Sequence, residues 1–107
     1  MVSAEITGVI RKYLHLLAQN GIPVQRAFVY GSHARNDERK DSDIDVMLVS
    51  DYFDTTDLYK ISKPWRYAAD VDHRLEPVSV SEKRFINDDA SPLIAVVKQE
   101  GIEIKMS

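Results

Sequence analysis

Three aspartates alternate with other residues in one short segment, at Asp41, Asp43 and Asp45. Side chains two residues apart on a β-strand point to the same face. If residues 43–49 form a strand, Asp43 and Asp45 stand side by side at its solvent-accessible start. Two like charges repel each other unless a cation neutralises them, and carboxylate oxygens suit a pair of Mg²⁺ ions that would bind a phosphate. The alternative is that the three are ordinary turn and strand-end residues.

A Gly-Ser pair, Gly31-Ser32, interrupts a run of β-forming residues ten positions before the Asp-x-Asp segment. Glycine at the end of a strand allows another group to approach the backbone closely. The amides of the turn that follows and the hydroxyl of Ser32 can bind phosphate oxygens. A Gly-Ser turn by itself is usually only a turn. The combination of a strand, Gly-Ser, ten residues of which only Ala34 is apolar, and a second strand that opens with Asp-x-Asp favours a phosphate site.

The segments VYGSHAR (residues 29–35) and SDIDV (residues 42–46) resemble the signature of DNA polymerase β-type nucleotidyltransferases. The resemblance is closer to the minimal nucleotidyltransferase (MNT) domains, and it extends over nearly the whole chain. One departure is Asn36, where family members commonly have Gly. Asn tolerates a left-handed backbone better than most residues, so we expect the turn to be retained.

The resemblance implies a polymerase β-like core, a small mixed sheet backed by helices, of the α/β or α+β class. It implies transfer of a nucleoside monophosphate from a triphosphate to an acceptor hydroxyl, with release of pyrophosphate. Asp43 and Asp45 would hold two Mg²⁺ ions, and Gly31 and Ser32 would hold the β- and γ-phosphates of ATP.

The resemblance also implies a third carboxylate from a neighbouring strand, and Glu76 is the candidate. On a strand over residues 74–80, Glu76 shares a face with apolar residues further along, as Asp45 does on its own strand. Glu76 would then be a third metal ligand and catalytic residue. Asp70 and Asp72 are rivals that precede the strand, and an ordinary surface charge on an edge strand is the alternative.

Several cations and one histidine could assist the site. Arg35 follows the Gly-Ser turn and could bind the triphosphate, or it could be a solvated arginine. His33 could act beside Ser32, although its side chain could also face solvent. Lys60, Lys63 and Arg66 recur every three residues, and a solvated helix face is the simpler interpretation.

From the length of 107 residues we expect no second domain that would bind an acceptor. MNT proteins are often paired with a small helical HEPN protein, a ribonuclease toxin. The resemblance therefore implies a type VII antitoxin that attaches AMP to a tyrosine of such a toxin. A partner-binding module without catalysis and a freestanding small-molecule nucleotidyltransferase remain open.

The elements that must position these residues follow from periodicity and from turn signals. Apolar residues spaced three and four apart predict a helix over residues 3–20, capped by Ser3 and ended at Gly21. Further helices are expected to about Ala69 with a break near Pro64, from Ser81, and from Ser91 to Glu100. Strands are expected over residues 24–30, 43–49, 74–80 and 102–105, with residues 33–42 a short helix or exposed loop.

Composition narrows the class of protein. The 107 residues predict a single domain over 1–107, and 14 basic against 17 acidic residues give net −3, so direct nucleic-acid binding is not expected. The chain has no cysteine, which excludes disulfides, thiolate metal sites and a cysteine nucleophile. No apolar run approaches the roughly 20 residues that span a bilayer. A cytoplasmic protein without membrane contact is expected, and a homo-oligomer is left open.

Overall fold

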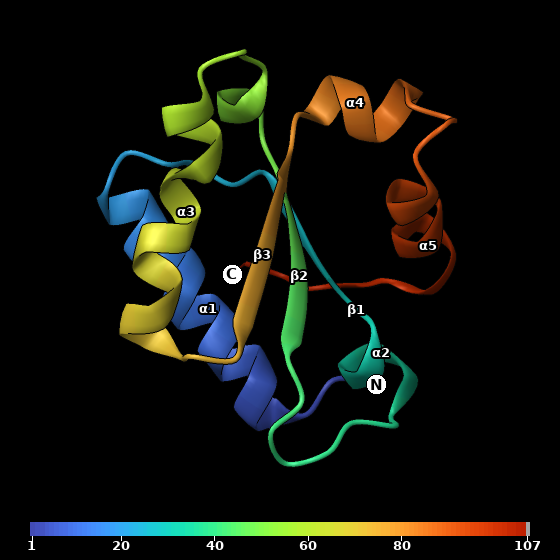
Figure 1. Ribbon diagram of the computed structural model, residues 1–107. Helices are drawn as coiled ribbons and strands as arrows, with labels where there is room; N and C mark the ends of the chain where they lie inside the picture. The colour runs from blue at the N-terminus through green and yellow to red at the C-terminus, as the bar shows by residue number, and fades with distance from the viewer. Residues whose placement is uncertain (107) are drawn as a thin grey trace.

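The computed structural model describes residues 1–106, and its four strands form one sheet in the order β3-β2-β1-β4 (Figure 1). β2 and β3 are parallel, and the other neighbours are antiparallel. The elements are α1 (Ala4–Gln19), β1 (Arg26–Tyr30), α2 (Ser32–Arg35), β2 (Ile44–Val49), the 3₁₀-helix η1 (Asp51–Phe53), α3 (Leu58–Val71), β3 (Leu75–Val80), α4 (Glu82–Asn87), α5 (Pro92–Glu100) and β4 (Ile102–Glu103). The predicted small mixed sheet with helices packed on it is confirmed.

The two faces of the sheet pack against different helices. α1 and α3 cover one face, where Val46 of β2 belongs to a buried cluster with side chains of both helices (Figure 1). On the other face Met47 of β2 packs in a second cluster with Phe85 of α4 and Ile94 of α5. β2 is therefore buried on both sides, as its run of apolar residues predicts.

The predicted helix ends are set by capping side chains. Ser3 Oγ accepts a hydrogen bond of 3.2 Å from the Ile6 N–H at the start of α1, and Ser91 Oγ accepts one of 3.2 Å from the Ile94 N–H at the start of α5. These bonds satisfy N–H groups that have no partner within the helix. Gly21 follows α1 with a φ of 77°, a left-handed conformation that glycine adopts without strain.

The break expected near Pro64 is wrong, because α3 continues through this residue to Val71. The Tyr13 hydroxyl of α1 donates a hydrogen bond of 2.6 Å to the Pro64 carbonyl, and both residues are buried. This contact holds α3 against α1 at the proline. Local propensity is overridden here by tertiary packing.

Pro77 lies in β3, which occupies one edge of the sheet, one of the two settings (edge or bulge) that a proline within a strand predicts. The ladder to β2 begins with the Ile44 N–H, which donates to the Arg74 carbonyl at 2.7 Å, and ends with the Ser50 N–H, which donates to the Val80 carbonyl at 3.1 Å. The N–H and C=O groups of the even-numbered residues of β3 therefore point toward β2, and the backbone nitrogen of Pro77 points away from β2. The missing N–H of the proline therefore costs no ladder bond.

Strand boundaries differ slightly from the predicted ones. The strands predicted over 24–30, 43–49 and 74–80 begin one or two residues later, and the last strand covers only Ile102–Glu103. Such differences are usual where a loop enters a strand in an extended conformation. Within residues 1–106 no helix is long and apolar enough to cross a membrane.

Candidate active site

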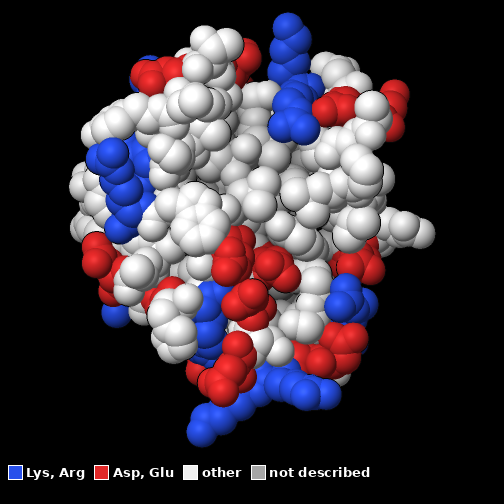
Figure 2. Space-filling model, viewed as in Figure 1, with Lys and Arg blue, Asp and Glu red and all other residues white. Residues whose placement is uncertain are grey.

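One row of residues crosses three strands of the sheet and brings the motif residues together. Tyr30, the last residue of β1, pairs with Asp45 of β2, and Asp45 pairs with Glu76 of β3. Neighbouring strands lie about 4.7–4.9 Å apart, so paired side chains on one face are in reach of each other. This acidic row, formed by Tyr30, Asp45 and Glu76, lies on the sheet face that α4 and α5 cover only in part (Figure 1). Figure 2 shows acidic side chains gathered near the starts of β2 and β3.

Gly31 closes the row directly after Tyr30 and lies against Asp45. Its φ of 75° and ψ of −150° belong to a region that only glycine adopts readily. A Cβ at this position would overlap a carboxylate oxygen of Asp45. Glycine is therefore required for two reasons, its backbone conformation and the close approach of the aspartate.

α2 begins at Ser32, immediately beyond this glycine. Ser32 is partly exposed, and no hydrogen bond within residues 1–106 uses its hydroxyl. Asn36 follows α2 with φ 62° and ψ 30°, the left-handed conformation expected of the residue that replaces the usual glycine.

Asp43 precedes β2 instead of opening it, because the strand begins at Ile44. Its side chain is exposed, whereas Asp45 and Glu76 are half-buried. The loop before β2, and not the pleat of a strand, therefore sets the position of Asp43.

The electrostatics of the site reflect crowding of negative charge. Burial raises the pKa of Asp45, and the charges of Asp43 and Glu76 raise it further, while His33 and Arg35 oppose the shift. The pKa of Tyr30 is raised to about 12 by burial and by the charges of Asp45 and Glu76. Asp43 and Glu76 thus lie close enough to disfavour the ionised form of Asp45, which is the situation a bound cation relieves.

The donor set agrees with a hard cation, because all three candidates offer only carboxylate oxygens. Across residues 1–106, however, no three His, Asp or Glu side chains are arranged to hold a metal ion. The charges of Asp43 and Glu76 act on Asp45, but the three side chains would have to move closer together to bind one ion. Mg²⁺ would supply the force that draws like charges together.

Arg35 does not point freely toward this site. Its guanidinium donates to Asp37 at 3.2 Å and to Glu100 of α5 at 3.1 Å, and its pKa is raised first by the hydrogen bond to Asp37. Binding of a triphosphate by Arg35 would require exchange of at least one of these carboxylates for a phosphate.

The structure gives His33 and Tyr30 surroundings that the sequence does not reveal. His33 is buried, although a solvent-facing side chain was one of the two expectations, and its Nε2 lies 3.4 Å from the Ser42 carbonyl. Tyr30 belongs to the core, as its place in an apolar strand predicts, and it also forms one end of the row with Asp45 and Glu76. Its alternation with Phe28 along β1 could have signalled that the two share a face.

The rivals of Glu76 lie elsewhere. Asp70 is exposed within α3, and Asp72 caps the end of this helix, where it forms an ion pair of 2.8 Å with Arg74. That pair and its hydrogen bonds lower the pKa of Asp72 to about 2.

The three cations spaced along the same helix serve local contacts. Lys60 lies over the Tyr52 ring, Lys63 donates to the Asn20 carbonyl at 3.4 Å, and Arg66 donates to the Tyr59 hydroxyl at 3.1 Å. α3 packs on the face opposite to Asp45, so none of the three adjoins the acidic row.

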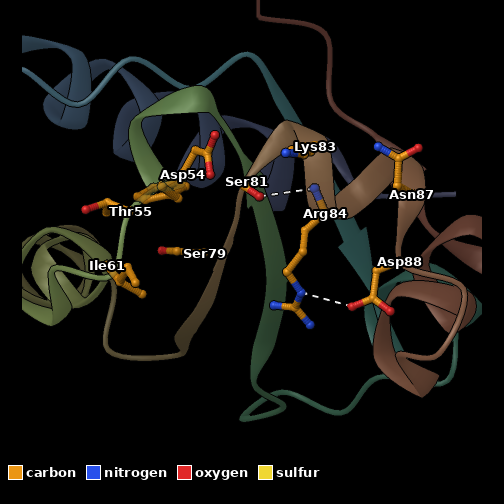
Figure 3. A pocket seen from close by; sticks show the side chains of 10 residues that line it. Asp54, Thr55, Ile61, Ser79, Ser81, Lys83, Arg84, Asn87 and Asp88 are labelled. Atoms are coloured by element: carbon orange, nitrogen blue, oxygen red, sulfur yellow. Dashed lines mark hydrogen bonds and ion pairs between the residues drawn. The ribbon is translucent and has the colours of Figure 1, made fainter.

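A cavity of about 580 Å³ lies near the other end of β3, between the start of α3 and α4 (Figure 3). Ser79 and Ser81 line it from β3 and the turn that follows, and Arg84 of α4 donates to Asp88 at its rim. Neither Asp45 nor Glu76 lines this cavity. The acidic row therefore lies outside this cavity.

Comparison with known families assigns the chain to a class. The family model described as "Polymerase beta, Nucleotidyltransferase" matches residues 12–106. The chain belongs to this nucleotidyltransferase family. No curated protein matches the sequence significantly.

Solved structures share the fold at low sequence identity. A protein of Sulfolobus solfataricus assigned as a nucleotidyltransferase superposes with a TM-score of 0.66 at 13% identity, covering 92% of this chain and 78% of that one. A toxin–antitoxin structure with AMP-PNP gives 0.59 at 20% identity, covering 91% and 73%. A mutant of the toxin–antitoxin MntA-HpeT gives 0.57 at 18% identity, again covering 91% and 73%. At these identities the likeness shows the fold.

Proposed function

We propose that this nucleotidyltransferase transfers AMP from ATP, with Mg²⁺, to a tyrosine hydroxyl of a partner protein, as the antitoxin of a toxin–antitoxin pair. The observation that carries the proposal is the row formed by Tyr30, Asp45 and Glu76, which ends at the Gly31-Ser32 turn. It joins a place for a polyphosphate to a cluster of carboxylates on one open face of the sheet.

In this proposal the triphosphate lies across the turn, with the Ser32 hydroxyl and the free backbone amides of the turn donating to the β- and γ-phosphates. Asp43, Asp45 and Glu76 would hold two Mg²⁺ ions. When bound, Mg²⁺ neutralises phosphate charge and stabilises the charge that develops on transfer. Without it the acidic row would repel the nucleotide.

The acceptor oxygen would attack the α-phosphorus in line with the bond to the β-phosphate. The new O–P bond forms as that bond breaks, and pyrophosphate leaves with the electron pair. Glu76 at the edge of the row would orient the acceptor and receive its proton, directly or through water. Positioning and charge neutralisation would supply most of the rate.

A protein acceptor agrees with the position of the acidic side chains at the surface of the molecule, where Figure 2 shows them near the starts of β2 and β3. Both toxin–antitoxin neighbours support a protein partner. A helical HEPN toxin is the partner that the sequence resemblance implies, and its tyrosine would be the acceptor.

A second function, binding a toxin without catalysis, is favoured by two observations. The carboxylates are not arranged as a three-ligand metal site, and Arg35 is paired with Asp37 and Glu100. In that case the acidic row would have no catalytic function, and binding of this protein alone would inhibit the toxin.

One experiment separates the two functions. The protein is mixed with Mg-ATP and the product of the adjacent gene, and the intact mass of each protein is measured. Transfer predicts a gain of one AMP on the partner, lost in EDTA and in the Asp43→Asn/Asp45→Asn double variant. A partner that binds and is inhibited with no gain in mass would establish the non-catalytic function and refute transfer.

A further inference from the structure

His33 is the most buried side chain among the histidines, acids and bases of residues 1–106, with 4% of its surface exposed. Burial of an imidazole is unfavourable unless a ring nitrogen has a hydrogen-bonding partner. The partner here is the Ser42 carbonyl, 3.4 Å from Nε2. In the tautomer that carries hydrogen on Nε2, His33 donates to this oxygen.

This contact joins the two halves of the motif. His33 belongs to α2, next to Ser32, whereas Ser42 belongs to the loop that precedes Asp43. Ser42 also closes a turn with Arg39: the Ser42 N–H donates to the Arg39 carbonyl at 3.0 Å, and the Ser42 hydroxyl accepts from the Arg39 N–H at 2.7 Å. Because Ser42 is part of this turn, the contact from His33 to the Ser42 carbonyl also fixes the position of the turn over residues 39–42.

The same loop has a second anchor at Arg74. Its guanidinium binds Asp72 through two hydrogen bonds of 3.0 and 2.8 Å, and it also donates to the Lys40 carbonyl at 3.5 Å. The Arg74 carbonyl accepts from Ile44 N–H at 2.7 Å. Asp43 thus lies between one residue that His33 holds and one that Arg74 holds.

We propose that His33 is a positioning residue, which fixes the Ser42 carbonyl and thereby places Asp43 beside Asp45 and Glu76. The proposal rests on the metal site of the proposed function. It accounts for a buried histidine beside the phosphate turn, and for the ordered approach of an acid that lies outside the strand. Outer partners that orient metal ligands typically contribute 10–100-fold to metal affinity.

Two variants separate the effect of the hydrogen bond between His33 and Ser42 from the effect of the volume that the imidazole ring fills. His33→Gln retains an N–H donor of similar reach, and His33→Leu fills similar space without a donor. Binding of Mn²⁺ in the presence of a non-hydrolysable ATP analogue is measured by calorimetry. We expect 10–100-fold weaker Mn²⁺ binding in His33→Leu and recovery to within a few-fold of the unmodified chain in His33→Gln.

Hydrogen–deuterium exchange tests the position of the loop without metal. Exchange over residues 36–43 should accelerate in His33→Leu, while exchange in α1 stays unchanged. If the leucine variant does not fold, His33→Asn takes its place, because its shorter amide does not reach Ser42.

The outcomes distinguish this inference from the proposed function. If the unmodified chain binds Mn²⁺ and His33→Leu matches it in both affinity and loop exchange, the positioning role is wrong. Equal loss in the leucine and glutamine variants would also overturn it, because packing alone would then explain the effect. If the unmodified chain binds no Mn²⁺, the metal site of the proposed function is refuted, and faster loop exchange would still show the His33 contact to be real.

Discussion

Replacement of Gly31 by alanine tests the contact on which the site depends. The backbone there has φ 75° and ψ −150°, a glycine region that costs other residues on the order of 1–3 kcal/mol. The new methyl would also overlap the Asp45 carboxylate and force it from its rotamer, at a cost of about 0.5–1.5 kcal/mol. We therefore expect Gly31→Ala to lower the free energy of unfolding by about 2–4 kcal/mol.

For a chain of this size, about 1 kcal/mol corresponds to roughly 4 °C in the melting temperature, so the expected decrease is about 8–16 °C. Thermal and urea unfolding, followed by circular dichroism, measure the change. Gly21→Ala is the matched control, because Gly21 has a similar φ of 77° but no atom within 4 Å of the added Cβ. Gly21→Ala should cost only the backbone term, about 1–2 kcal/mol.

A double-mutant cycle with Asp45→Ala separates the overlap from the backbone strain. When the carboxylate is absent, Gly31→Ala should cost about 1 kcal/mol less than it does in the unmodified chain. A coupling energy near zero would show that Gly31 does not contact Asp45 as the structure indicates. A Gly31→Ala variant as stable as the unmodified chain would refute the backbone argument as well.

Three further predictions concern the acidic row. Asp43→Asn/Asp45→Asn should leave the metal-free protein at least as stable at neutral pH. Because the pKa of Asp45 is raised in the folded state, its negative charge destabilises the fold above this pKa. The stability gained by the double variant should therefore disappear below about pH 4, where Asp45 is protonated in both the folded and the unfolded chain. A large loss of stability of the double variant in urea unfolding at neutral pH would contradict this prediction. ATP should bind more tightly in Mg²⁺ than in EDTA, and equal calorimetric affinities would argue against a metal. Glu76→Gln should preserve ATP affinity and lower transfer by orders of magnitude in a radiolabel assay, with Asp70→Asn as the near-normal control; the reverse result would displace Glu76 from the site.

Much of the architecture follows from local patterns. The period of apolar residues and the capping serines predict α1 and α5, because a helix must bury one face and satisfy its first N–H groups. Pro77 predicts an edge strand or a bulge, since proline has no N–H to donate to a ladder, and the structure has the edge strand. Asn36 predicts a left-handed turn, and the structure has one.

Pro64 shows where local reasoning ends. In isolation a proline inside a helix favours a break, but the Tyr13 hydroxyl from another helix binds its carbonyl and α3 continues. The same limit applies to His33, whose burial depends on a carbonyl nine residues away. Neither partner is visible in the sequence around the residue itself.

The sequence by itself determined the type and order of the elements and the residues that could do chemistry, because periodicity, caps and the Gly-Ser and Asp-x-Asp spacing are local. Only the tertiary structure decided that Tyr30, Asp45 and Glu76 form one row, because strand register depends on pairing between distant segments. It also decided that Arg35 is paired with Asp37 and Glu100 and that Asp43 lies outside β2. Charge partners and loop positions depend on which surfaces meet when the helices pack on the sheet, and no local pattern encodes that choice.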